Sequence, residues 1–157
     1  MKPGLAVLEV SEPREAAQRA LVADLLHNFG EATLKVTGTS MIPSLLPGDT
    51  LVIKSRPLSE LRAGQVVLCL RPDTLAAHRL VRRDGLHLIT RGDSLARPDP
   101  AVRQDQFLGV VVAAVRRGRA VDLRFTFGRR MAAWLFRRSD LAARVYLRFN
   151  RPQTAGE

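Results

Sequence analysis

The sequence predicts a mainly β domain of the α+β class: a compact antiparallel sheet with an amphipathic helix before it and basic helices after it. From Glu31 onward, short apolar runs show the period of two that is typical of strands. Turns rich in glycine, proline and aspartate separate these runs. Helical spacing of apolar residues occurs at the two ends of the chain. We therefore divide the chain into an N-terminal helical segment, a β domain and a basic helical extension with a tail, at residues 1–30, 31–125 and 126–157.

The N-terminal helix is expected to begin at Ser11, a residue suited to capping, with Glu12 and Pro13 in its first turn. Gly30 is a natural stop signal. One apolar stripe follows the helical spacing and consists of Ala17, Leu21, Val22, Leu25, Leu26 and Phe29. Packing of this stripe against the sheet is the favoured interpretation, and docking on a partner or membrane surface is the alternative.

The central part of the chain contains the predicted strands. They lie at 33–37, 50–54, 65–70, 75–82, 86–90, 107–116 and 119–125. Asp84-Gly85 stands between two apolar runs and is typical of a tight hairpin turn.

The C-terminal part is helical and strongly basic. Eleven arginines lie between Arg116 and Arg151, against two aspartates. Ser139-Asp140 is suited to capping a second helix, so we expect two helices. Arginine stems beside Trp134 and other aromatic residues suit the interface of an anionic membrane. A solvated basic face above a core-facing stripe is an equal alternative.

Composition limits the function classes. At 157 residues and 46% hydrophobic content the chain is a single folded domain rather than a disordered segment. The net charge of +10 favours anionic partners, which are acidic lipids, acidic peptides or nucleic acid. No nucleic-acid recognition motif accompanies the charge, so no specific nucleic acid is expected. The single cysteine, Cys69, lies in an apolar run and is interpreted as a buried, unreactive thiol. No apolar run reaches the length of about 18 residues that spans a bilayer.

The most informative stretch runs from Thr37 to Asp49. Ser40 sits in a bend two residues after Gly38, and Pro47-Gly48-Asp49 forms a second turn. Because short β-branched runs flank the stretch, Ser40 is expected where a strand ends and a side chain can point out of the sheet. This position suits an exposed nucleophile, and it also suits an ordinary turn serine.

This stretch resembles the nucleophile box of the signal peptidase I and LexA-like serine peptidases, roughly Gly-x-Ser-Met-x-Pro-x-Leu-x-x-Gly-Asp. The positions in register are Gly38, Ser40, Met41, Pro43, Leu45, Gly48 and Asp49. The resemblance covers about residues 34 to 116. It implies the β fold of those peptidases, Ser40 as nucleophile, and Met41 and Pro43 as substrate-binding residues.

By the same resemblance, His78 occupies the position of the general base. A histidine followed by Arg79 looks like the endoplasmic-reticulum and archaeal type of signal peptidase. The bacterial and LexA-like type has lysine there, and no lysine follows Lys54 in this chain. His87 matches no motif position and is interpreted as an outward strand residue.

The run from Arg91 to Asp99 resembles the family's Gly-Asp-Asn stretch with its two acidic positions. The resemblance favours Asp99 as the carboxylate that orients His78, and Asp93 as a supporting or structural residue. Two turn aspartates that bind backbone N–H groups are the alternative. For the oxyanion, the Ser40 N–H is the first expected donor and the Thr39 hydroxyl a weaker one.

These observations predict a serine endopeptidase that cleaves an extended peptide through an acyl-enzyme, without metal or cofactor. Two alternatives stay open: a self-cleaving LexA-like regulator, and a catalytically silent module that binds a membrane surface or a protein partner. The sequence contains no anchor of the kind that familiar signal peptidases carry, nor an export signal. We therefore expect the cytoplasm, including the inner face of the membrane.

Overall fold

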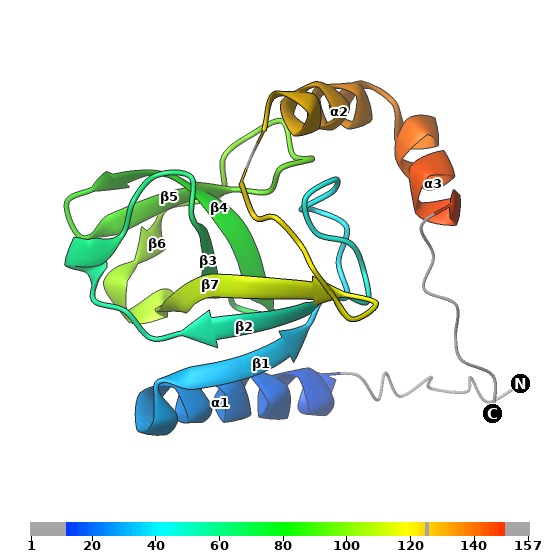
Figure 1. The fold of residues 1–157 in the computed structure, drawn as a ribbon. Helices are drawn as coiled ribbons and strands as arrows, with labels where there is room; N and C mark the ends of the chain where they lie inside the picture. The colour runs from blue at the N-terminus through cyan, green and yellow to red at the C-terminus, as the bar shows by residue number, and fades with distance from the viewer. Residues whose placement is uncertain (1–11, 125, 150–157) are drawn as a thin grey trace, which may run out of the picture.

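The computed structural model describes residues 12–124 and 126–149, in which eight strands form one antiparallel sheet (Figure 1). The strand order is β1-β2-β7-β3-β4-β5-β6, and β8 pairs with β7. The strands are β1 Glu31–Lys35, β2 Thr50–Lys54, β3 Val66–Leu70, β4 Leu75–Asp84, β5 His87–Arg91, β6 Val102–Arg103, β7 Phe107–Arg116 and β8 Arg119–Ala120. The predicted fold class, mainly β with helices at both ends, is confirmed.

One predicted strand is shorter than expected, and one strand was missed. The strand expected at 119–125 is only the two-residue β8, because the hydrogen bonding to β7 ends one residue later, where the Val121 N–H donates to the Ala114 carbonyl oxygen at 2.8 Å. Residue 125 lies outside the described residues. The short strand β6 was not predicted, since two residues are too few to show a period. The expected hairpin is present: Asp84 pairs with His87, and Gly85 has a φ of 57° in the turn.

Helix α1 (Glu12–Phe29) lies along β1 (Figure 1). Val22 and Leu26 are buried in the core, and Leu25 packs against it. Leu21 and Phe29, by contrast, are 59% and 76% exposed. The stripe that contacts the sheet is therefore narrower than predicted, because only one edge of the helix faces β1 and β7. The expected cap, Ser11, lies outside the described residues.

The loop that contains Ser40, residues 37–49, is held between two hydrophobic clusters. Met41 and Leu45 belong to the main core, and the Leu45 N–H donates to the Met41 carbonyl oxygen at 3.0 Å, as in one helical turn. Ile42 and Leu46 point into a separate cluster with Phe136. We call this segment the Ser40 loop. Its two-sided packing fixes the backbone next to the serine.

The C-terminal helices, α2 (Phe127–Arg138) and α3 (Asp140–Phe149), lie over the end of the domain near the Ser40 loop (Figure 1). Phe136 is buried, and its ring lies 5.1 Å from that of Tyr146, measured between centroids. The prediction of two helices after residue 126 is therefore confirmed for the described residues.

The close approach of Gly109 in β7 to the end of β2, its neighbour in the sheet, generates a prediction. A Cβ atom at this position would lie 2.7 Å from the Lys54 carbonyl oxygen and 2.9 Å from Ile53 Cγ2. Gly109→Ala should therefore lower the free energy of unfolding by about 1–3 kcal/mol, measured by urea denaturation. The control is Gly128→Ala in α2, where nothing lies within 4 Å and stability should be unchanged or slightly higher. Wild-type stability of the Gly109→Ala protein would contradict this close packing.

Candidate active site

Ser40, His78 and Asp99 form a continuous chain of hydrogen bonds. Ser40 Oγ lies 2.8 Å from His78 Nε2, and His78 Nδ1 lies 2.6 Å from Asp99 Oδ2. The three residues come from the Ser40 loop, from β4 and from the segment between β5 and β6. The side chains of His78 and Asp99 are each 12% exposed, so bulk water competes little for their hydrogen bond. The structure thus brings together the three residues that the resemblance singled out.

The charge of Asp99 decides how the hydrogens point along this chain. Burial alone would raise the pKa of Asp99, but hydrogen bonds from His78 and Thr90, with the charges of His78 and Arg71, hold it below its ordinary value. The ionised carboxylate only accepts hydrogen bonds. In neutral His78 the hydrogen therefore sits on Nδ1, and Nε2 accepts the hydroxyl hydrogen of Ser40. This arrangement lets an imidazole take a proton from serine.

Thr90 and Arg71 hold Asp99 in place, and sequence analysis singled out neither. Thr90 Oγ1 donates to Asp99 Oδ2 at 2.6 Å, and the Asp99 N–H donates to the Thr90 carbonyl oxygen at 2.8 Å. Arg71 Nη2 lies 3.2 Å from Asp99 Oδ2, and Nη1 donates to the Pro100 carbonyl oxygen at 3.1 Å. Thr90 is fully buried, and a buried hydroxyl needs a hydrogen-bond partner. Its inward position in β5 was therefore the one signal in the sequence that could have indicated a polar contact. Arg71 follows β3 in a turn and gave no such signal.

Ser94 and Gly92 fix the peptide on the carbonyl side of Ser40. The Ser94 N–H and Oγ both donate to the Ser40 carbonyl oxygen, at 3.0 and 2.8 Å. A Cβ atom on Gly92 would lie 2.6 Å from the same oxygen. Only glycine allows this close approach. Ser94 stands where the Gly-Asp-Asn stretch of the resembling peptidases has asparagine, and it contacts the Ser40 backbone directly.

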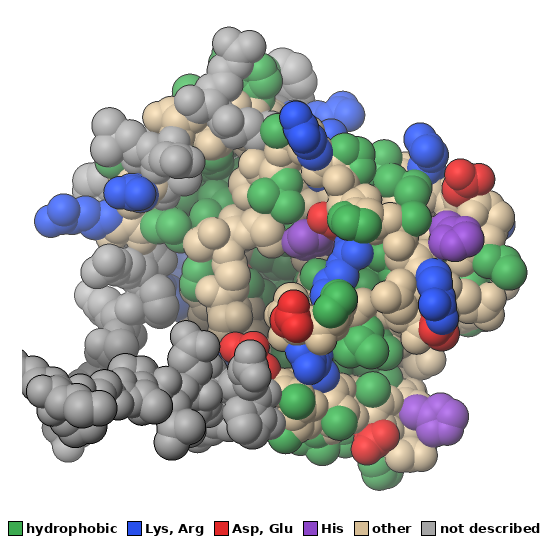
Figure 2. Space-filling view, turned by 180° about the vertical axis from the view of Figure 1, so that it is seen from behind, with side chains coloured by type: hydrophobic (Ala, Val, Ile, Leu, Met, Phe, Trp, Pro, Cys, Tyr) green, Lys and Arg blue, Asp and Glu red, His purple; other side chains and the backbone are tan. Residues whose placement is uncertain are grey.

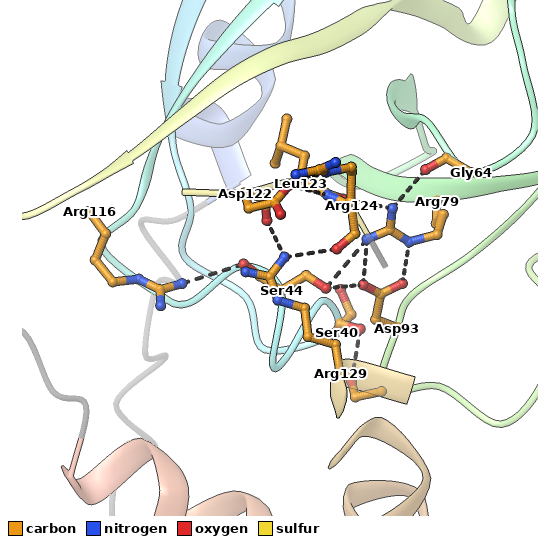
Figure 3. A network of polar contacts seen from close by, with 11 residues as sticks. Ser40, Ser44, Gly64, Arg79, Asp93, Arg116, Asp122, Leu123, Arg124 and Arg129 are labelled. Atoms are coloured by element: carbon orange, nitrogen blue, oxygen red, sulfur yellow. Dashed lines mark hydrogen bonds and ion pairs between the residues drawn. The ribbon is translucent and has the colours of Figure 1, made fainter. Parts of the chain in front are cut away.

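Asp93 lies in a separate buried network. Its oxygens accept from Nε and Nη2 of Arg79, each at 2.7 Å, and from Ser44 Oγ at 2.5 Å. Arg79 Nη1 also donates to the carbonyl oxygens of Gly64 and Leu123, at 2.7 and 3.0 Å (Figure 3). Asp93 and Arg79 are only 3% and 7% exposed. Of the two roles predicted for Asp93, supporting and structural, this position corresponds to the structural one, because it does not contact the histidine.

The Gly-Asp end of the motif also has a structural role. Asp49 is buried, and its Oδ2 accepts from the Leu46 N–H at 2.8 Å. Arg116 at the end of β7 donates to both Asp49 oxygens, at 2.8 and 2.7 Å. The hydrogen bond to Asp49 raises the pKa of Arg116 above its ordinary value. Asp49 therefore closes the second turn of the Ser40 loop and ties it to the sheet.

Ser40 and His78 open into a cleft of about 550 Å³. Its two long walls are the segments 34–38 and 74–78, and α1 contributes polar side chains at one end. Figure 2 shows the face opposite to that of Figure 1. Hydrophobic side chains line a hollow near the centre of this face. The contributions of α1 are Glu15, Gln18 and Arg19.

The other predicted site residues differ in their relation to this cleft. Met41 is among its lining residues, although its side chain is almost wholly buried. Pro43 is buried and does not line the cleft, so direct contact of Pro43 with a substrate is not supported by its position. Thr39 is exposed and is not a lining residue; its carbonyl oxygen accepts from Ser94 Oγ at 3.1 Å.

A family model described as Peptidase S24-like matches residues 5–112. The chain belongs to this family. The match confirms the predicted relationship to the signal peptidase and LexA-like serine peptidases, whereas the endoplasmic-reticulum and archaeal type stays a prediction. A search of curated proteins found no match. The matched part of this S24-like chain includes α1, the Ser40 loop and Asp99, and it ends within β7, so that α2 and α3 lie beyond it.

Several other groups in the S24-like chain lie apart from the site. Burial raises the pKa of the Cys69 thiol to about 12, so this cysteine is unreactive near neutral pH. His87 is exposed and faces Arg103 of β6. Among the described residues, no group of histidine, cysteine and carboxylate side chains is arranged to hold a metal ion. None of the helices within residues 12–124 and 126–149 has the length and apolar character needed to cross a membrane.

The lowered pKa of Asp99 predicts how stability changes on acidification. Because its folded pKa lies below the ordinary value of 3.8, the stability that Asp99 contributes is present above that pH and is lost as pH falls through the folded pKa. Asp99→Asn should therefore make the loss of unfolding free energy between about pH 5 and pH 2 shallower. Urea denaturation at a series of pH values measures this.

The matched control for this experiment is Asp73→Asn, which removes an exposed carboxylate in the turn before β4. This variant should keep the wild-type dependence on pH. An unchanged acid limb in the Asp99→Asn protein would show that Asp99 is not held ionised by its neighbours.

Proposed function

We propose that this chain is a serine endopeptidase in which Ser40 is the nucleophile, His78 the general base and Asp99 the carboxylate that orients His78. One observation carries the proposal: the hydrogen bonds of 2.8 Å from Ser40 Oγ to His78 Nε2 and of 2.6 Å from His78 Nδ1 to Asp99 Oδ2. Membership of the Peptidase S24-like family supports it.

The proposed reaction proceeds in two stages. Ser40 Oγ attacks the carbonyl carbon of the peptide bond while His78 Nε2 takes the hydroxyl proton. Asp99 stabilises the imidazolium that forms, and His78 then gives the proton to the leaving amine. In the second stage, a water molecule activated by His78 hydrolyses the ester on Ser40 and regenerates the hydroxyl.

The Ser40 N–H is the proposed oxyanion donor. No hydrogen bond within the described residues takes up this N–H, so it is available to a developing negative charge. The neighbouring carbonyl oxygen of Ser40, in contrast, is held by Ser94. Such a donor contributes roughly 10²–10³ in rate to acyl transfer. The Thr39 hydroxyl stays a weaker candidate, since Thr39 does not line the cleft.

The substrate is proposed to be an extended peptide that lies between the segments 34–38 and 74–78. Backbone groups of two flanking strands suit a peptide added as a further strand. Next to Ser40 the cleft is bounded by Met41, Leu45 and Leu51, all buried. Because these side chains fill the space beside the serine, small side chains should precede the scissile bond.

Cleavage in cis is a second candidate. Glu15, Gln18 and Arg19 of α1 line the same cleft, so the first turns of α1 lie beside the site. Mass spectrometry of stored wild-type protein, with Ser40→Ala as control, tests this. Clipping at a rate that does not depend on concentration would favour cis cleavage, and intact protein with activity on added peptides would favour cleavage in trans.

The proposal predicts selective labelling of Ser40. An acylating serine probe, such as a fluorophosphonate, should label the wild-type protein, and Ser40→Ala and His78→Ala should each abolish labelling because the nucleophile or its base is lost. The effect expected for the loss of the base is roughly 10²–10⁴-fold in rate. Gel fluorescence and the mass of the labelled peptide provide the readout.

Ser59→Ala is the matched control, because Ser59 is an exposed serine in the short turn between β2 and β3. Labelling of this variant should equal that of the wild type. An unlabelled wild-type protein, or a label that persists in Ser40→Ala, would contradict the proposal and favour a catalytically silent binding module.

A further inference from the structure

A second cavity lies between α2 and the sheet, with a volume of about 1400 Å³. None of its lining residues lines the cleft of Ser40 and His78. His78 and Arg79 are consecutive in β4, and consecutive side chains of a strand point to opposite faces. His78 accordingly faces the cleft, and Arg79 faces this second cavity. We call it the arginine recess.

Exposed hydrophobic side chains gather at the arginine recess. Val81 and Val112 of the sheet are 40% and 42% exposed, and Met131 and Trp134 of α2 are 50% and 47% exposed. They are four of the eleven large hydrophobic residues that stand exposed among the described residues. Single exposed hydrophobic residues are ordinary, but a cluster of them around one recess indicates an interaction surface.

The charge of the arginine recess is strongly positive. Five arginines line it, and Asp93, its one acidic lining residue, is bound to Arg79. In the part of the chain that the structure describes, no ion pair involves Arg62, Arg91 or Arg130. The recess therefore suits an anionic partner that also has apolar surface.

Helix α2 is fixed above the recess by contacts on its other side. Phe136 is buried against Ile42 and Leu46, and Ala133 is fully buried. Arg129 donates to the carbonyl oxygens of Asp122 and Arg124 (Figure 3). These contacts hold α2 in place, so Met131 and Trp134 remain exposed in the folded protein.

We propose that the arginine recess, together with the exposed Met131 and Trp134 of α2, docks on the surface of an anionic lipid bilayer. Tryptophan and arginine stems are suited to the bilayer interface, and arginines bind lipid phosphates. An amphipathic helix lies in the plane of that interface with its apolar residues among the acyl chains. Nucleic acid would neutralise the arginines but would leave Met131, Val81 and Val112 without apolar contacts. The α2 side of this surface, with Arg130, Met131 and Trp134, lies beyond the matched residues 5–112, whereas the sheet side lies within them.

Trp134 is the only tryptophan of the chain and reports directly on this surface. Vesicles of phosphatidylcholine mixed with phosphatidylglycerol should shift its fluorescence to shorter wavelength and sediment the full-length protein, whereas phosphatidylcholine alone should do neither. The Ser40→Ala protein should bind equally, because docking does not depend on the peptidase chemistry. A loss of probe labelling and a loss of vesicle binding are thus separate results.

Matched variants test whether the recess itself binds. Arg62→Gln combined with Arg130→Gln should weaken binding by more than about tenfold, since each basic residue near an anionic surface contributes about fivefold. Arg103→Gln combined with Arg119→Gln removes the same charge from outside the recess and should weaken binding far less. Equal weakening by both pairs, equal binding to neutral vesicles, or a fluorescence shift with an oligonucleotide but not with anionic vesicles would each overturn the proposal.

Discussion

The hydrogen bond between His78 and an ionised Asp99 determines what the Ser40 hydroxyl can do. A serine beside an imidazole is activated only when the facing nitrogen carries a lone pair, and the tautomer of the ring depends on the group at its other nitrogen. Asp99 is itself held by Thr90 and by Arg71, which keep it charged although it is largely shielded from water. The polar chain therefore extends from Arg71 to the nucleophile, and each member orients the next.

This chain of hydrogen bonds requires three segments of the fold to keep fixed relative positions. The Arg79–Asp93 ion pair connects these segments. Arg79 comes from β4 directly after His78, Asp93 comes from the segment that leads to Asp99, and Ser44 comes from the Ser40 loop. Removing one partner of such a buried pair is strongly destabilising, by about 3–5 kcal/mol, because the other charge stays buried without compensation. One strand thus supplies the base on one face and the structural anchor on the other.

The sequence predicted the fold class and most strands because apolar alternation and turn residues are local signals. The sequence also linked Ser40, His78 and Asp99 in one hypothesis. That link came from the resemblance to a peptidase motif, because local periodicity and turn signals do not show which distant residues meet. The contacts of Thr90 and Arg71 depend on which residues meet across the sheet, and a single sequence does not contain that information. The exposed Leu21 and Phe29 illustrate the same limit: helical spacing identifies a face, but only packing decides how wide the contact with the sheet becomes.

The central claim is that Ser40 forms a covalent acyl-enzyme with an extended peptide. A crystal structure of the protein after reaction with a peptide-based acylating inhibitor tests it most directly. The account predicts a bond to Ser40 Oγ, an inhibitor chain between the segments 34–38 and 74–78, and an oxyanion facing the Ser40 N–H. An adduct on another residue, or an unmodified Ser40 with the His78 ring turned away from Asp99, would contradict it.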